Sequence, residues 1–230
     1  MKRPAPGCRW AGLLGLAGGF ILMAGCANWL HWPRPSGPGT YVVRPGDTLY
    51  SIAWRYRLDY RRVAARNGIG PPYLIYPGER IRLHGARPVP LRPTRRMVRP
   101  PPLAQHRYGG VWVWPVTGPL VGSFSGHGLN GSGINLAGQS GETVVAAHAG
   151  RVVYVGSGLP GYGRLIIIRN DPEYLSAYAF NRKIIVQEGM IVQAGQPIAR
   201  MGVRHGQALL HFEIRRDGVP INPLTLLPRR

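Results

Sequence analysis

Acidic residues are scarce in this chain, since nine Asp and Glu stand against 29 Lys and Arg, for a formal net charge of +20. This imbalance favours an acidic partner such as nucleic acid, an anionic membrane or an anionic cell-wall polymer. Lys2 and Lys183 are the only lysines, so 27 of the 29 basic residues are Arg. An arginine-biased genome would give the same pattern, and the charge alone does not choose among these partners.

Cysteine is also nearly absent, because the chain holds only Cys8 and Cys26. This excludes a disulfide framework and a cysteine-rich zinc site. A basic start is followed by an apolar run over residues 11–24 that is too short to span a bilayer comfortably. The run ends in LMAGC, which resembles a bacterial lipobox. The resemblance implies that residues 1–25 are a lipoprotein signal peptide and that Cys26 is lipidated. An ordinary signal peptide or an uncleaved anchor is the alternative. No Asp follows Cys26, and by resemblance this favours the periplasmic face of the outer membrane.

Long helical periodicity is missing as well, while Gly (33) and Pro (23) are abundant, which predicts short strands joined by turns. Residues 108–230 contain short apolar or alternating runs, including VWVWPV, RLIIIRN, YLSAYAF and LLHFEIRR. We expect a mostly β protein whose C-terminal part is an antiparallel β-domain, either a sandwich or a part-open barrel. Residues 26–39 are expected to be a tether. Residues 86–107, rich in Pro and Arg, are expected to be an extended linker.

Residues 40–85 predict a small βααβ module. A strand at about residues 41–43 is followed by Thr48, which can cap a helix bearing Leu49, Ile52 and Ala53. A second helix is expected over about residues 60–66, and PGERIRL supplies a turn and a returning strand. The opening YVVRPGDTLYSIA and this close resemble a LysM domain. The resemblance implies binding to the N-acetylglucosamine-containing glycan of peptidoglycan, with the candidate residues Gly46, Asp47, Thr48 and Asn67.

The segments of residues 111–228 contain no Gly-rich phosphate loop and no serine-nucleophile elbow. Their order, including GINLAG, GETVVAAHAGRVVYVG, GYGRLIIIRN and LLHFEIRRDGVPINPL, resembles the M23 (LytM-type) zinc metallopeptidase domain. Active members of that family hold zinc through an H-x-x-x-D motif and the second His of an H-x-H motif. The first His of H-x-H and a His in a Tyr-Ala-His segment assist catalysis. Such a site needs three protein ligands and an open position for water.

Most of these positions have lost their functional side chains in this chain. Gly131 stands at the first His, Asn135 at the Asp, Phe180 at the Tyr-Ala-His histidine and Leu209 at the first His of H-x-H, so only His211 remains. One imidazole does not hold catalytic zinc, and a neutral Asn is a poor substitute for a carboxylate. We therefore expect no catalytic residue, no metal and no other cofactor.

Three other histidines, His127, His148 and His205, lie in the same domain but not at the family's ligand positions. His211 is instead expected to be hydrogen-bonded in the floor of a cleft that has become apolar. Leu209 and Glu213 would share its strand face, because side chains alternate along a strand. An apolar groove of this kind suits a docking peptide or amphipathic helix.

Together, the lipoprotein signal, the LysM module, the Pro-rich linker and the degenerate M23 domain resemble the NlpD/EnvC family of murein hydrolase activators. In that family the inactive cleft binds a regulatory element of an N-acetylmuramoyl-L-alanine amidase and thereby opens the amidase. The resemblance implies three partners: peptidoglycan, a periplasmic amidase and the outer membrane through lipidated Cys26. Nucleic acid is not expected. The amidase-binding cleft would comprise Asn135, Phe180, Leu209, His211 and Glu213. A zinc endopeptidase with atypical ligands and a purely structural wall tether are the alternatives.

Overall fold

The computed structural model describes residues 39–85, 110–128 and 131–230. The predicted signal peptide, the lipidation site at Cys26, nearly all of the tether and the Pro/Arg-rich linker lie outside the described residues. Within the described part of the chain, no helix is long and apolar enough to cross a membrane.

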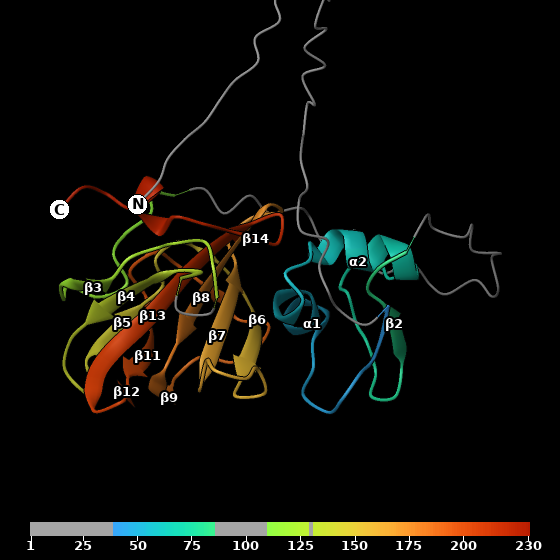
Figure 1. The fold of residues 1–230 in the computed structure, drawn as a ribbon, viewed down its shortest axis with the longest axis horizontal. Helices are drawn as coiled ribbons and strands as arrows, with labels where there is room; N and C mark the ends of the chain where they lie inside the picture. The colour runs from blue at the N-terminus through green and yellow to red at the C-terminus, as the bar shows by residue number, and fades with distance from the viewer. Residues whose placement is uncertain (1–38, 86–109, 129–130) are drawn as a thin grey trace, which may run out of the picture. The chain divides into compact units, whose positions relative to one another are not determined.

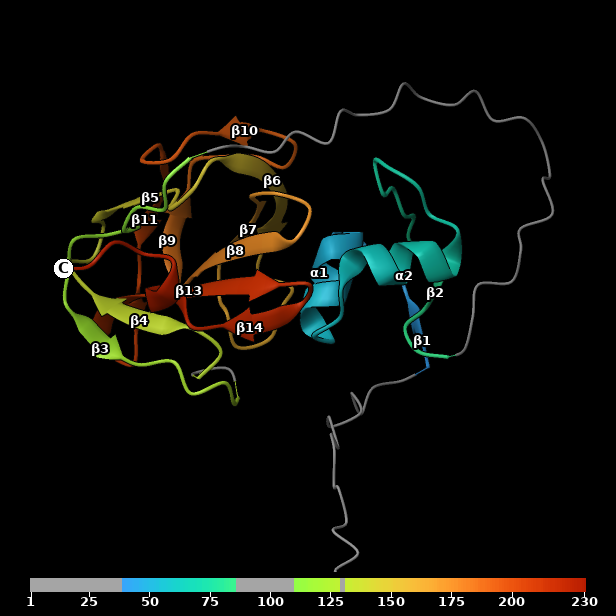
Figure 2. The same ribbon diagram turned by 90° about the horizontal axis from the view of Figure 1, so that it is seen from above.

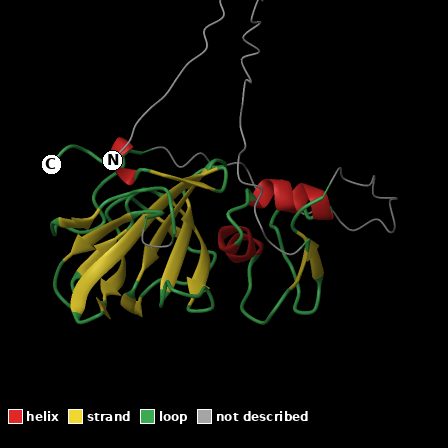
Figure 3. Ribbon diagram, in the orientation of Figure 1, coloured by secondary structure: helices red, strands yellow, loops and turns green. Residues whose placement is uncertain are grey.

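Residues 39–85 form the predicted βααβ module (Figure 3). Strand β1 (Thr40–Val42) pairs antiparallel with β2 (Arg80–Arg82), and helices α1 (Leu49–Arg55) and α2 (Tyr60–Asn67) lie between them in the sequence. Apolar side chains from all parts of the module are fully buried, including Leu49, Ile52, Val63, Ile81 and Leu83. Buried and exposed side chains alternate along β2, because Ile81 faces the core while both flanking arginines are exposed.

The helix boundaries of this module follow from local hydrogen bonds. Thr48 caps α1, since its Oγ1 accepts from the Ser51 backbone N–H at 3.1 Å and the Ser51 Oγ accepts from the Thr48 N–H at 3.0 Å. This reciprocal pair is a capping box. Asp59 caps α2 through the Arg61 N–H at 2.8 Å, and Gly68 ends that helix with a left-handed φ of 67°. The predicted cap at Thr48 is therefore confirmed.

Residues 110–230 form an antiparallel β-domain, as Figure 1 shows. In the described residues, one nine-stranded sheet has the order β10-β6-β7-β8-β13-β4-β3, with β12 and β14 also paired to β13. A three-stranded sheet has the order β5-β11-β9. The strands are β3 (Leu120–Gly122), β4 (Ile134–Ala137), β5 (Thr143–Val145), β6 (Gly150–Gly156), β7 (Leu165–Arg169), β8 (Tyr174–Ala179), β9 (Asn181–Ile184), β10 (Ile191–Val192), β11 (Pro197–Met201), β12 (Val203–Arg204), β13 (Gln207–Arg216) and β14 (Val219–Ile221). A 3-10 helix, η1 (Pro223–Thr225), follows the last strand.

The two sheets share one hydrophobic core. Val144 and Met201 of the small sheet belong to the same buried cluster as Leu136, Tyr178 and Phe212 of the large sheet. Strand β13 runs through the centre of the large sheet between β8 and β4 (Figure 2). The predicted mostly β, antiparallel fold is confirmed, and its central strand is the one that carries His211.

One predicted strand is absent. The apolar run VWVWPV, residues 111–116, is not a strand. It makes two isolated backbone bonds, from the Val113 N–H to the Ala147 carbonyl at 2.8 Å and from the Val145 N–H to the Pro115 carbonyl at 2.9 Å. Pro115 has no N–H and cannot donate to a ladder, so the segment borders the small sheet without extending it.

Candidate functional site

The sheet register brings several predicted site positions side by side. His211 on β13 pairs with Asn135 on β4 and, across its other edge, with Ala179 on β8. Phe180 directly follows β8, and its ring centroid lies 5.9 Å from that of His211. The side chains of Asn135 and Phe180, which are far apart in the sequence, therefore both lie beside His211.

Both ring nitrogens of His211 are engaged by side chains. Nδ1 lies 2.7 Å from Asn135 Oδ1, and Nε2 lies 3.1 Å from Glu213 Oε1. A carboxylate only accepts, so Nε2 carries the hydrogen in that pair. The Asn135 amide can present either its oxygen or its NH₂ group, so it can satisfy Nδ1 in either protonation state. With 1% of its surface exposed, His211 is a hydrogen-bonded residue beneath the surface.

Glu213 is the centre of this polar network. Its Oε1 accepts from the Ser132 hydroxyl at 2.5 Å and the Tyr162 hydroxyl at 2.7 Å, and its Oε2 accepts from Arg215 Nε at 3.0 Å. Burial alone would raise the pKa of Glu213, but the charge of Arg215 and the hydrogen bonds from His211 and Ser132 outweigh it and lower the pKa to about 2. The carboxylate is therefore charged and fully satisfied at neutral pH.

The side chains at the M23 ligand positions (Gly131, Asn135 and His211) and at the catalytic positions (Phe180 and Leu209) do not fit a zinc site. Phe180 and Leu209 offer only carbon, and both nitrogens of His211 are already bonded within the protein. A Cβ at Gly131 would lie 2.0 Å from Ser125 Oγ and 2.3 Å from the His127 carbonyl oxygen, so the backbone there has no room for a side chain. A structural or catalytic zinc site needs at least three protein ligands. Among the described residues, no group of three or more His, Cys, Asp or Glu could hold a metal ion.

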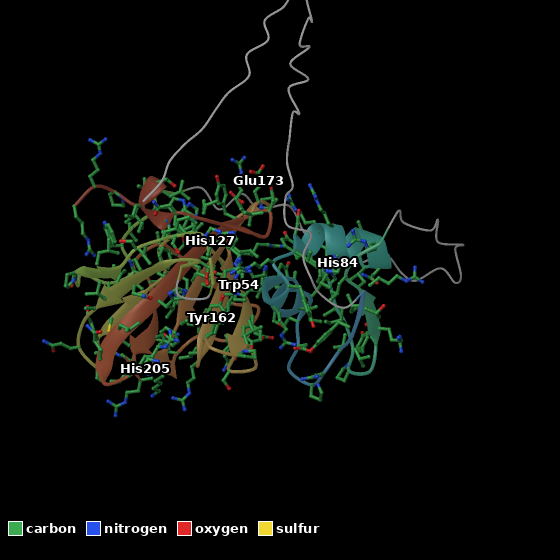
Figure 4. The ribbon with its side chains drawn as sticks, in the orientation of Figure 1. Trp54, His84, His127, Tyr162, Glu173 and His205 are labelled. Atoms are coloured by element: carbon green, nitrogen blue, oxygen red, sulfur yellow. The ribbon has the colours of Figure 1, made fainter. Side chains whose placement is uncertain are left out.

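The remaining histidines of the domain do not rebuild such a site. His148 is bonded through Nδ1 to the Ala149 carbonyl at 2.9 Å and through Nε2 to the Gly110 carbonyl at 3.1 Å. Figure 4 shows His127 and His205 well apart from each other. His127 Nδ1 lies 3.0 Å from the Ser125 carbonyl, and His205 sits in the turn between β12 and β13.

Phe180 and Leu209 form the apolar part of the site. Phe180 has a left-handed φ of 64° and lines a surface hollow of about 440 Å³. Leu209 is half-buried and packs against the hydrophobic cluster that includes Phe180, Tyr162 and Ala179. Asn135 is also half-buried, whereas Glu213 is completely buried. Leu209 and Asn135 therefore lie nearest the solvent, Phe180 is buried with 8% of its surface exposed, and His211 and Glu213 are buried almost completely.

Sequence reasoning missed three members of this network: Ser132, Tyr162 and Arg215. Arg215 follows Glu213 by two residues on the same strand, so the alternation of side chains was a usable signal. Ser132 and Tyr162 come from other segments and left no such signal in the sequence, because only the tertiary fold brings their hydroxyls to the carboxylate.

The predicted glycan-binding side chains of the βααβ module hold the module together. Asn67 Nδ2 donates to the Val63 and Arg82 carbonyls at 2.8 and 2.9 Å, and its Oδ1 accepts from the Arg82 N–H at 2.8 Å. Asp47 accepts from the Tyr41 hydroxyl at 2.7 Å and from the Arg44 N–H at 2.9 Å. Gly46, with φ of 81°, forms the turn before Asp47 and the Thr48 cap. A role of these four residues in glycan binding stays a prediction.

Comparison with known families matches both modules. The LysM domain matches residues 41–83, and Peptidase family M23 matches residues 130–223. The lipoprotein NlpD/LppB homolog of Pseudomonas aeruginosa is 42% identical over 85% of this chain and 79% of its own length. The chain belongs to the NlpD lipoprotein family. The murein hydrolase activator NlpD of Escherichia coli, a further relative, is 32% identical over 86% of this chain and 70% of its own.

Among solved structures, a zinc containing peptidase from Vibrio cholerae matches 49% of this chain and 39% of its own at 26% identity and a TM-score of 0.44. The two family matches show that this NlpD-family chain combines a LysM domain with an M23-type domain, as the sequence predicted. Its M23 positions carry the substitutions described above.

Proposed function

We propose that this chain activates a periplasmic N-acetylmuramoyl-L-alanine amidase through the surface around Phe180 and Leu209. The observation that carries the proposal is the conversion of the M23 site into a closed hydrogen-bonded network: both nitrogens of His211 are satisfied by Asn135 and Glu213. Because their polar atoms are already hydrogen-bonded, these side chains do not bind zinc. They instead hold strand β13 and the neighbouring apolar residues Phe180 and Leu209 in a fixed geometry. The relative from Escherichia coli is named a murein hydrolase activator.

In this proposal the five cleft residues have two roles. Phe180 and Leu209 supply apolar contact for a regulatory segment of the amidase, and Asn135 borders them. His211 and Glu213 support these residues from below. An activator of this kind works by binding the open state of its partner better than the closed state, which shifts the amidase population toward the open state.

In this proposal the chain acts in the cell envelope. Lipidated Cys26 anchors it to the outer membrane from the periplasmic side, and the LysM module binds peptidoglycan glycan. Both interactions concentrate the activator at the wall, where the amidase acts.

The test is dye release from labelled peptidoglycan by the protein alone with added zinc, by the amidase alone, and by the mixture. We expect the mixture to release more dye than the amidase alone, and the protein alone to release none. Release by the protein alone that a chelator abolishes would contradict the proposal and favour the zinc endopeptidase alternative.

Two variants then test the surface. Phe180→Asp and Leu209→Asp place a charge in the apolar part and should abolish activation while leaving sedimentation with peptidoglycan unchanged. Ile191→Asp, an exposed apolar residue on strand β10, is the matched control and should activate normally. If both surface variants activate as well as the control, the chain is a wall tether or acts through another surface.

A further inference from the structure

Four basic side chains surround two adjoining hollows beside Phe180. The hollows measure about 440 and 590 Å³ and share Arg164 and Arg182 in their linings. Arg204 lines the smaller hollow together with Phe180, and Lys183 lines the larger. We call Arg164, Arg182, Lys183 and Arg204 the cationic rim.

The linings of both hollows contain no acidic side chain. Among the described residues, carboxylates occur only at the borders that the hydrogen bonds identify: Glu188 Oε1 accepts from the Val155 N–H at 2.9 Å beside the larger hollow, and Glu142 Oε2 accepts from the Gln139 N–H at 3.0 Å, next to Ser140 of the smaller hollow. Four positive charges without a carboxylate among them create a local positive potential, and the low-dielectric walls of a hollow strengthen its effect on an anion.

Two members of the rim are held in place by the protein. The Arg204 guanidinium lies 4.2 Å from the centre of the Phe180 ring. Arg164 Nη1 donates to the Arg182 carbonyl. Because these cations are already positioned, a ligand that binds them orders fewer side chains and loses less of its binding free energy.

We propose that the cationic rim binds a carboxylate-rich segment of the amidase, directly beside the apolar contact at Phe180. The proposal rests on the proposed function and adds the chemistry of the partner. Arginine pairs with carboxylates through two parallel N–H···O bonds, which fixes orientation as well as charge. The rim lies next to an aromatic side chain, and a peptide that mixes acidic and apolar residues complements that combination better than a wall polymer does.

The strand position of the rim supports a peptide ligand. Arg182 and Lys183 lie on β9, which is the outer strand of the three-stranded sheet in the order β5-β11-β9. Both residues are exposed and line the larger hollow, and Arg182 also lines the smaller one. An acidic segment that approaches this edge would meet the cations before it reaches Phe180, so the charges would also accelerate association.

The experiment compares the double reversal Arg182→Glu/Lys183→Glu with a matched control, Arg80→Glu/Arg229→Glu, which reverses two exposed arginines outside the rim. Amidase affinity is measured by titration in low and high salt, and binding to purified peptidoglycan by sedimentation. We expect the rim variant to bind the amidase at least about tenfold more weakly than the control. We also expect its affinity to depend less on salt than that of the wild type.

The neutral variant Arg182→Gln/Lys183→Gln should show an intermediate loss, and its circular dichroism and thermal unfolding should match the wild type. Equal amidase affinity for the rim variant and the control would overturn the proposal. A loss of peptidoglycan binding with unchanged amidase binding would overturn it as well and assign the rim to a wall polymer. Failure of the wild type to bind the amidase would instead contradict the proposed function, and a loss in Phe180→Asp without a loss in the rim variant would contradict the rim alone.

Discussion

Single side chains decide what the former M23 site can do. Glu213 keeps a negative charge in the interior because Arg215, His211, Ser132 and Tyr162 all donate to it. Removing one partner of a buried charge pair leaves the other without compensation, so a single substitution here affects the stability of the whole domain.

Glu213→Gln should lower stability at neutral pH and flatten its dependence on pH. The pKa of Glu213 in the folded protein, about 2, lies below the ordinary value of 4.5, so its charged form stabilises the fold above pH 4.5 and this contribution is lost as the pH falls toward 2. The difference corresponds to about 3 kcal/mol. Urea unfolding at several pH values, followed by fluorescence, measures both effects.

The exposed carboxylate Glu173 provides the control. It pairs with Arg216 at 3.0 Å, with 41% of its side chain accessible, so Glu173→Gln should change stability by less than about 1 kcal/mol. Equal stability of Glu213→Gln and the wild type at neutral pH would show that the buried network contributes nothing net.

Local hydrogen bonds and strand pairing decide the secondary elements. The capping box at Thr48 and the left-handed Gly68 could be predicted from the residues themselves, because caps depend on neighbours three or four positions away. The strand predicted at residues 111–116 is absent for the opposite reason, because its formation depends on distant residues. The apolar run suits a strand, but a strand also needs continuous hydrogen bonding with a neighbouring strand. Pro115 has no N–H to donate, and the run makes only isolated backbone hydrogen bonds beside β5.

Thr48→Ala should destabilise the LysM module by about 1 kcal/mol, since the capping hydroxyl satisfies a helix N–H that then has no partner. A module with so small a core has little stability to spare, so the thermal midpoint of its transition should fall measurably. Thr48→Ser keeps the hydroxyl and should behave like the wild type. Identical midpoints for the Ala and Ser variants would contradict the role of the capping box.

The whole molecule joins a LysM module, which we propose binds the wall, to a domain that we propose acts on an enzyme. Joining two binding modules raises the effective concentration of the second at its target without adding contacts there. The net charge of +20 also raises the local concentration of the protein at its target when that target is anionic.

Deleting residues 40–85 should raise the concentration needed for half-maximal amidase activation on intact peptidoglycan by about a hundredfold, while activation at saturation is kept. Dye release measured over a range of activator concentrations tests this. Adding the LysM module as a separate chain should not restore the wild-type curve, because only the covalent link creates the effect. An unchanged half-maximal concentration would mean that the module does not localise the activator.

The amino-acid sequence by itself determined the two modules, the antiparallel β class and the loss of the zinc ligands. Alternating apolar residues, turn residues and caps act over short distances, and a missing ligand is visible wherever its motif can be aligned. Only the tertiary structure decided that both nitrogens of His211 are bonded, that Ser132 and Tyr162 meet Glu213, and that Gly131 has no room for a side chain. It also decided that Arg164, Arg182 and Arg204 line one hollow together with Phe180. These features join residues that are distant in the sequence, and the register of β13 with β4 and β8, together with the packing around it, sets their distances.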